Sequence, residues 1–246
     1  MGIPTLLLSY TFLSGLFLIA GVIMPPKLIK RNLMHIEYVK ITFLIILLTV
    51  CYKYILYMHR HEIYDKLVDY LLFKPLPLVN VFITNTVLFS YVIVTYIYTL
   101  NFDVIIDKLK NIFKSYRIFK TLVLAPIIEE LYFRLLFLLI MHINSFDSRL
   151  YYCLTSSLFF ALSHLSLLSI NAMLTQFTMT FIFGLYSSYI LIVTESLWPV
   201  VLLHFYCNLL GPPQSIPKSI DKKSKRTLQM ILFSSIPVFF AILMHF

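Results

Sequence analysis

The amino-acid sequence predicts an all-α, polytopic membrane protein built as a bundle of about eight transmembrane helices. Three observations support this prediction. The 246 residues are 60% hydrophobic and only 13% charged, which is far more apolar than an ordinary soluble domain. Apolar runs long enough to cross a bilayer, about 20 residues each, recur along the chain. The basic residues that give the net charge of +9 lie mainly in short segments between these runs.

The apolar runs define the candidate spans in order. They are residues 4–24, 39–58, 76–100, 122–142, 150–169, 172–193, 197–211 and 229–246. Prolines favour several of these boundaries because proline interrupts helical hydrogen bonding, and the seventh span is expected to close at Gly211. The first run has no basic residue before it, so we interpret it as a retained helix and not a cleaved signal. We expect a single transmembrane domain over residues 1–246.

The basic residues predict the orientation of this bundle. Connections of odd number, counted with Lys40 at the start of the second span, carry 14 Lys and Arg residues, and those of even number, counted with Lys53 near its end, carry five. Because cytoplasmic loops are enriched in these residues, the odd connections are assigned to the cytoplasm. Topology and contact with anionic membrane lipid account for the positive charge, so nucleic acid is not expected as a partner. The basic run over residues 218–226 fits either role.

The connection between the third and fourth spans has helical periodicity of its own. Apolar residues recur at helical spacing from Ile105 to Phe119, while Asp107, Lys110 and other charged residues occupy the opposite face. This pattern predicts an amphipathic helix. Such a helix would either lie in the cytoplasmic headgroup layer or pack on the bundle as a solvated linker.

Three charged residues lie within the first turns of the predicted fourth span: Glu129, Glu130 and Arg134. Each costs at least ~2.5–3.5 kcal/mol at bilayer depth on insertion scales, so such residues are functional candidates. Glu130 and Arg134 have the i, i+4 spacing of an ion pair, whereas Glu129 points about 100° away. We therefore assign Glu130 and Arg134 to structural support and Glu129 to chemistry. Pro126 is expected to start or kink this helix and to place both acids near its positive end.

Two later spans carry histidines at a matching depth. Glu129, His164 and His204 lie about five to seven residues from the cytoplasmic ends of their spans, or roughly 8–10 Å below the surface. His204 and Asn208 have i, i+4 spacing and can face one pocket. These four residues are therefore expected to line an intramembrane cavity that faces the cytosol. Phe160, four residues before His164, is expected to support the site by packing.

This set of side chains favours hydrolysis of an acyl bond by activated water. Burial in an apolar cavity disfavours a bare carboxylate charge, which suits Glu129 as a general base. His204 and Asn208 could donate hydrogen bonds to a developing oxyanion. The sequence contains no nucleophile elbow, and we interpret Ser163 and Cys207, which adjoin site residues, as packing.

A zinc site is the main chemical alternative. Two histidines and a glutamate can form a catalytic three-ligand site. However, the sequence has no His-Glu-x-x-His motif, and a metal on Glu129 would leave the base unassigned. Cys51, Cys153 and Cys207 lack the paired spacing of a disulfide framework or a thiolate metal site. We therefore expect no cofactor.

Two other classes of protein also fit parts of the pattern. A transporter or proton relay uses buried acids and histidines, but it needs polar steps on both sides of the midplane, where His142 is the one obvious candidate. A noncatalytic scaffold of the same fold would have no need of an acid at the depth of Glu129.

Three short motifs resemble those of the type II CAAX prenyl endopeptidases, the Ras-converting enzyme family, and look closest to its eukaryotic branch. They are Glu-Glu-x-x-x-Arg at residues 129–134, Phe-x-x-x-His at 160–164 and His-x-x-x-Asn at 204–208. Each motif alone is weak, but three in this order in separate spans are specific. The resemblance covers about residues 119–213, which would form the catalytic core.

The resemblance implies a hydrolase that removes the last three residues of prenylated CAAX proteins, such as small GTPases. It implies a multi-pass protein of the endoplasmic reticulum membrane with an active site open to the cytosol. It makes Glu129 the base that activates water, with His164 assisting. His204 and Asn208 would be the pair that stabilises the oxyanion.

Overall fold

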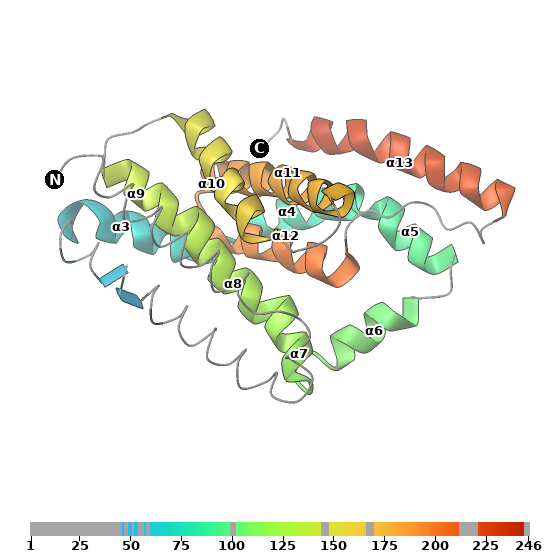
Figure 1. Ribbon diagram of the computed structural model, residues 1–246, viewed down its shortest axis with the longest axis horizontal. Helices are drawn as coiled ribbons and strands as arrows, with labels where there is room; N and C mark the ends of the chain where they lie inside the picture. The colour runs from blue at the N-terminus through green and yellow to red at the C-terminus, as the bar shows by residue number, and fades with distance from the viewer. Residues whose placement is uncertain are drawn as a thin grey trace. The chain divides into compact units, whose positions relative to one another are not determined.

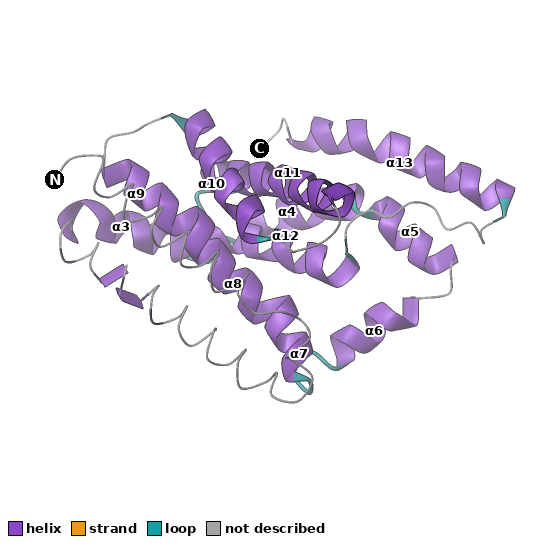
Figure 2. Ribbon diagram, in the orientation of Figure 1, coloured by secondary structure: helices purple, strands orange, loops and turns teal. Residues whose placement is uncertain are grey.

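The computed structural model describes residues 46, 49–50, 52–53, 57, 60–98, 102–143, 148–165, 170–211 and 221–243. Within these residues every regular element is a helix, as Figure 2 shows. The predicted all-α class is therefore confirmed for this part of the chain. The predicted first span lies outside the described residues, and most of the second lies outside them too.

The chain divides into two compact units, each assembled from separate segments of sequence. The first unit contains residues up to Leu72 together with Ile128–Leu197. The second contains Phe73–Ile127 together with the residues from Trp198 onward. The first two motifs, at residues 129–134 and 160–164, fall in the first unit. The third, at 204–208, falls in the second unit.

The first unit is organised around two helices that pack along each other, α10 (Arg149–Ser163) and α11 (Ile170–Thr194), as Figure 1 shows. Their contact uses small residues. A Cβ added at Gly184 of α11 would lie 2.9 Å from the Cα of Ser157 on α10, which is closer than real side chains allow. Small residues permit this approach of helix backbones within membranes. The unit also contains α3 (Arg60–Leu71) and α9 (Phe137–Ile143), which contact each other.

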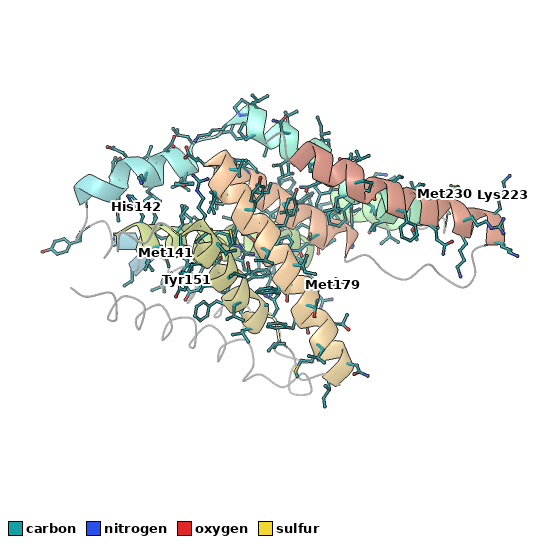
Figure 3. All side chains as sticks on the ribbon, turned by 90° about the horizontal axis from the view of Figure 1, so that it is seen from above. Met141, His142, Tyr151, Met179, Lys223 and Met230 are labelled. Carbon is teal, nitrogen blue, oxygen red and sulfur yellow. The ribbon has the colours of Figure 1, made fainter. Side chains whose placement is uncertain are left out.

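The second unit is built from short helices and one long one. In order they are α4 (Pro75–Leu88), α5 (Ser90–Tyr98), α6 (Phe102–Lys110), α7 (Tyr116–Phe119), α12 (Leu197–Leu210, whose first residue falls in the first unit) and α13 (Lys222–Leu243). α13 packs against α4 and α5, and Lys223 and Met230 mark its course in Figure 3. The buried core combines apolar side chains from α5, α6, α12 and α13, including Val92, Ile105, Leu209 and Leu228.

The helical residues that carry the acids run without interruption from Tyr116 to Ile143. Two stretches of this run are π-helical, η2 (Lys120–Leu124) and η3 (Leu131–Leu136), and α8 (Ala125–Glu130) lies between them. Pro126 therefore does not start the helix, and the prediction that it places the acids at a positive helix end is wrong. The π turn before Pro126 accommodates the missing N–H group within a continuous helix.

The predicted amphipathic helix over residues 105–119 is also divided. α6 ends at Lys110, turns follow at 111–114, and Ser115 has extended backbone angles before α7 begins. The Asn111 side chain bonds both the carbonyl and the carboxylate of Asp107. Asn and Ser compete with the backbone for hydrogen bonds in this way and favour helix ends. Ile105 is buried as expected, whereas Phe113 is 84% exposed.

The number of spans stays a prediction. Among the described residues, α11 is long and apolar enough to cross a membrane, a second span is possible if α3 and α4 are counted together, and α12 is apolar but shorter. The predicted third span divides at Phe89 into α4 and α5. The predicted end of the seventh span is confirmed, because α12 stops at Leu210 and Gly211 follows with φ of +77°. Glycine adopts this left-handed conformation at little cost.

Candidate active site

Glu129 and His164 meet in the first unit, although 35 positions separate them in the sequence. Oε2 of Glu129 lies 3.5 Å from Nε2 of His164. This distance is within reach of an ion pair but longer than a well-formed N–H···O hydrogen bond. The side chains are 22% and 30% exposed respectively, so both are partly sheltered and still accessible to water or a ligand.

The position of His164 at the end of α10 determines which ring nitrogen faces Glu129. Its Nδ1 lies 2.8 Å from the carbonyl oxygen of Phe160 and 3.1 Å from Oγ of Ser163. A carbonyl can only accept, so Nδ1 carries a hydrogen and donates it. Nε2 then carries the lone pair of the neutral ring, so it can accept a proton that Glu129 holds. The pair is therefore arranged to hold and transfer one proton.

Ser163 has a larger part in this geometry than the sequence indicated. Its hydroxyl donates to the Phe160 carbonyl at 2.7 Å and its oxygen faces Nδ1 of His164. The interpretation of Ser163 as packing is therefore wrong. The last turn of a helix is looser than its interior, so the 100° offset expected between neighbours does not separate these two side chains.

Phe160 lies between the histidine and the buried arginine. Its ring centroid is 4.2 Å from that of His164 and 4.0 Å from the guanidinium carbon of Arg134. A guanidinium at this distance over an aromatic face forms a cation–π contact. Phe160 is 2% exposed, so its buried ring packs against one side of His164 and supports it.

The ion pair predicted between Glu130 and Arg134 is present. Nε of Arg134 lies 3.2 Å from Oε2 of Glu130, and neither side chain is exposed to solvent. Arg134 also donates to Oγ of Ser187 from Nε at 3.1 Å and from Nη2 at 2.7 Å. Removing one member of a buried pair is costly because it leaves an uncompensated charge. Ser187 was not predicted, and the signal for it was a polar residue in the apolar α11.

Side-chain hydroxyl groups stabilise the π-helical segment η3. Tyr52 donates to the carbonyl of Leu131 at 2.9 Å, Ser156 to that of Phe133 at 2.7 Å, and Tyr152 to that of Arg134 at 3.2 Å. π turns are frequent at functional sites. Here the hydroxyl groups hold the wide turns directly after the two acids.

His204 and Asn208 lie on α12 in the second unit. His204 is 5% exposed, and Nδ2 of Asn208 donates to the carbonyl of Thr121 at 2.9 Å. This hydrogen bond was not predicted. The approach of His204 and Asn208 to Glu129 stays a prediction.

Glu129 and His164 could also serve as two ligands of a metal site in the first unit. Within the described part of this unit, no third histidine, cysteine or acid joins them in an arrangement suited to an ion. A catalytic zinc usually has three protein ligands. The pair by itself is suited to proton transfer.

These observations define a class: a highly apolar protein, helical in every regular element of its described residues, with a partly sheltered glutamate–histidine pair beside a buried ion pair. Residues 111–210 match the family described as "Type II CAAX prenyl endopeptidase Rce1-like". This match includes all three motifs and nearly coincides with the core predicted at 119–213.

One curated relative supports the same family. The chain is 27% identical over 145 residues to "Probable CAAX prenyl protease 2" of Schizosaccharomyces pombe, which covers 54% of this chain and 53% of the relative. The match thus spans about half the length of that protein. No solved structure matches the chain. The resemblance that the three motifs indicated is therefore supported: residues 111–210 are similar to the Rce1-like type II CAAX prenyl endopeptidase family.

Proposed function

We propose that this protein is an intramembrane endopeptidase that removes the C-terminal tripeptide of prenylated CAAX proteins. The observation that carries the proposal is the Glu129–His164 pair, with Nε2 facing the carboxylate at 3.5 Å inside the family-matched region. The substrates would be prenylated proteins such as small GTPases. The site would open to the cytosol from the endoplasmic reticulum membrane, in a chain with about eight spans.

The proton-transfer pair would perform general acid–base catalysis. Glu129 takes a proton from a water molecule while the water oxygen attacks the scissile carbonyl carbon. The fixed Nδ1–H of His164 keeps Nε2 toward the carboxylate, so the proton can be shared within the pair. Collapse of the tetrahedral intermediate breaks the C–N bond, and the same proton passes to the leaving amine. The products are a prenylcysteine carboxylate and a tripeptide with a free amino group.

His204 and Asn208 would stabilise the intermediate. The imidazole and the amide can each donate a hydrogen bond to the oxyanion, and preorganised donors of this kind commonly contribute ~2.7–4 kcal/mol. Glu130 and Arg134 would take no part in proton transfer, because the pair is fully buried. Their part would be to support the helix that carries Glu129.

The reaction proposed here needs no metal or other cofactor. The water is activated by a carboxylate, and the oxyanion is stabilised by hydrogen-bond donors. Dialysis against a tight chelator should leave activity unchanged. A lasting loss of activity that only added zinc restores would contradict this part of the proposal.

The central experiment uses the purified full chain in liposomes with a farnesylated CAAX peptide. The parent should release the tripeptide, and Glu129→Gln should lower kcat about 10²–10⁴-fold, the usual contribution of a general base. An unprenylated peptide of the same sequence is the matched substrate control. Equal release by parent and variant would contradict the role of Glu129. No release by the parent would contradict the proposed function and favour a transporter or scaffold.

A further inference from the structure

The π pattern of η2 gives the carbonyl group of Thr121 no backbone donor. The N–H of Ala125 bonds the carbonyl of Lys120, five residues back, in the π pattern of η2. The next donor in this pattern would be residue 126, which is proline and has no N–H. The Thr121 carbonyl therefore lacks the donor of this pattern at the point where the helix changes from π to α geometry.

Asn208 supplies the missing donor from α12. Its Nδ2 lies 2.9 Å from the Thr121 oxygen, across 87 positions of sequence. The surrounding contacts hold α12 at this place. Leu122 packs in one core with Leu209, and Nζ of Lys108 donates to the Leu209 carbonyl at 3.1 Å.

This hydrogen bond determines how the Asn208 amide faces. The Thr121 carbonyl oxygen accepts a hydrogen bond from the NH₂ group of Asn208. In the flipped amide two acceptor oxygens would face each other, so that orientation is disfavoured. The amide is planar, so anchoring one N–H hydrogen also sets the direction of the second. A donor that is already oriented costs no reorganisation when a negative charge develops.

We propose that Pro126 and the π turn before it form a positioning device for Asn208. By removing the backbone donor for Thr121, they reserve that carbonyl for one N–H of Asn208 and hold the other N–H ready for the oxyanion. Thr121 and Pro126 are positioning residues here, and neither touches the substrate. This inference rests on the proposed function, because it assigns Asn208 to oxyanion binding.

The kinetic test replaces Pro126 with alanine in the full chain. Pro126→Ala supplies an N–H that can bond Thr121, so the Asn208 amide loses its exclusive anchor. We expect kcat for the farnesylated peptide to fall about tenfold with KM within about twofold, since the lost interaction is made in the transition state. Pro237→Ala, which removes the proline inside α13, is the matched control and should leave kcat unchanged. An unchanged kcat in Pro126→Ala, or an equal fall in Pro237→Ala, would overturn the proposal.

A second measurement detects the hydrogen bond between Asn208 and the Thr121 carbonyl without an activity assay. Thermal unfolding is compared among the parent, Asn208→Ala, Pro126→Ala and the double variant. Asn208→Ala should lower the Tm of the parent by about 2–4 °C, as expected when a carbonyl loses its donor in a chain of this size. The loss should be less than half as large in the Pro126→Ala background, where the backbone supplies a donor. An equal loss of Tm in both backgrounds would overturn the proposal that the Thr121 carbonyl anchors the Asn208 amide.

The two measurements distinguish failure of this inference from failure of the proposed function. A parent that cleaves no prenylated peptide would overturn the proposed function, and with it the catalytic purpose of the anchor. A parent that cleaves the peptide but shows no coupling between Asn208 and Pro126 would overturn the positioning device alone.

Discussion

Two neighbouring glutamates on one helix have contrasting surroundings. Glu130 pairs with Arg134 in full burial, whereas Glu129 faces His164 with both side chains partly exposed. Arg134 is further held by Ser187. Adjacent acids on one helix can therefore have different environments, one that suits a structural charge and one that would suit the proposed chemistry. Full burial in an ion pair hinders proton exchange with water at Glu130, while partial exposure permits it at Glu129.

The largest effect is expected when the ion pair between Glu130 and Arg134 is broken. Glu130→Gln removes the carboxylate that compensates Arg134 in a buried setting, which commonly costs about 3–5 kcal/mol. We expect a large fall in thermal stability and poor recovery of folded protein in detergent. Glu129→Gln is the matched control, because it changes the neighbouring acid at a partly exposed position and should unfold near the parent temperature. Equal stability of the two variants would remove the contrast.

A double substitution sharpens the same comparison. Glu130→Met with Arg134→Met replaces both charges by apolar side chains of similar size, and such replacements are often neutral or stabilising. The double variant should therefore unfold well above Glu130→Gln. A double variant as unstable as the single one would show that the charges themselves are required for folding.

A smaller effect is expected at Ser187. Ser187→Ala removes the acceptor for two N–H groups of Arg134, which leaves buried donors unsatisfied at a cost of about 1–3 kcal/mol. Ser234→Ala on α13 removes an exposed serine that bonds its own helix and serves as the control. Chemical or thermal unfolding of both variants measures the difference, and equal stability would argue against support of Arg134 by Ser187.

At the reactive pair, Ser163→Ala should alter activity without altering the fold. It removes one of the two oxygens that face Nδ1 of His164, which weakens the hold on the ring by about 1 kcal/mol, or about fivefold in kcat/KM. The pH dependence of kcat/KM should shift as well, because Nδ1 loses a hydrogen-bond partner. If Ser163→Ala kept the kcat/KM and the pH profile of the parent, Ser163 would have no role in orienting His164.

The smallest expected effect lies outside both pairs, at the start of α13. The Asp221 carboxylate accepts from the backbone N–H groups of Lys223 and Ser224. A hydrogen bond from the Ser224 side chain, with these backbone bonds, holds the pKa of Asp221 below its ordinary value. Because the folded-state pKa is lowered, the stabilisation is present above the unfolded pKa and is lost as pH falls through the folded value.

Hydrogen exchange over the first turns of α13 measures this effect. Asp221→Ala should speed exchange at neutral pH, whereas Asp221→Asn should behave like the parent there, since asparagine is also a good N-cap. On acidification the parent should lose protection and Asp221→Asn should not. An acid-linked change in both proteins would assign it to another group.

Local rules account for the features that could be predicted. The i, i+4 spacing of Glu130 and Arg134 predicted their ion pair, because the period of a helix places these side chains on one face. Gly211 predicted the end of α12 through its freedom to adopt positive φ. The order of the three motifs predicted the similarity to the family over residues 111–210. Each of these depends on a few neighbouring residues or on the order of residues along the chain.

Other features escaped prediction because they depend on competing local bonds or on distant partners. α3 contains several charged residues, so its sequence lacks the continuous apolar run that predicts a span. Asn111 and Ser115 ended the helix that the apolar periodicity had extended to Phe119. The two π turns leave no signature in hydrophobic spacing, although Pro126 marks one of them.

The sequence by itself determined that this protein is helical and highly apolar, that Glu130 pairs with Arg134, and which residues are candidates for chemistry. Only the tertiary structure decided that Nε2 of His164 faces Glu129, that Ser187 holds Arg134, and that Asn208 bonds the Thr121 carbonyl. The physical reason is distance along the chain. Helical periodicity relates residues within a few turns, whereas these contacts join residues 35 to 87 positions apart and form only when helices pack side by side.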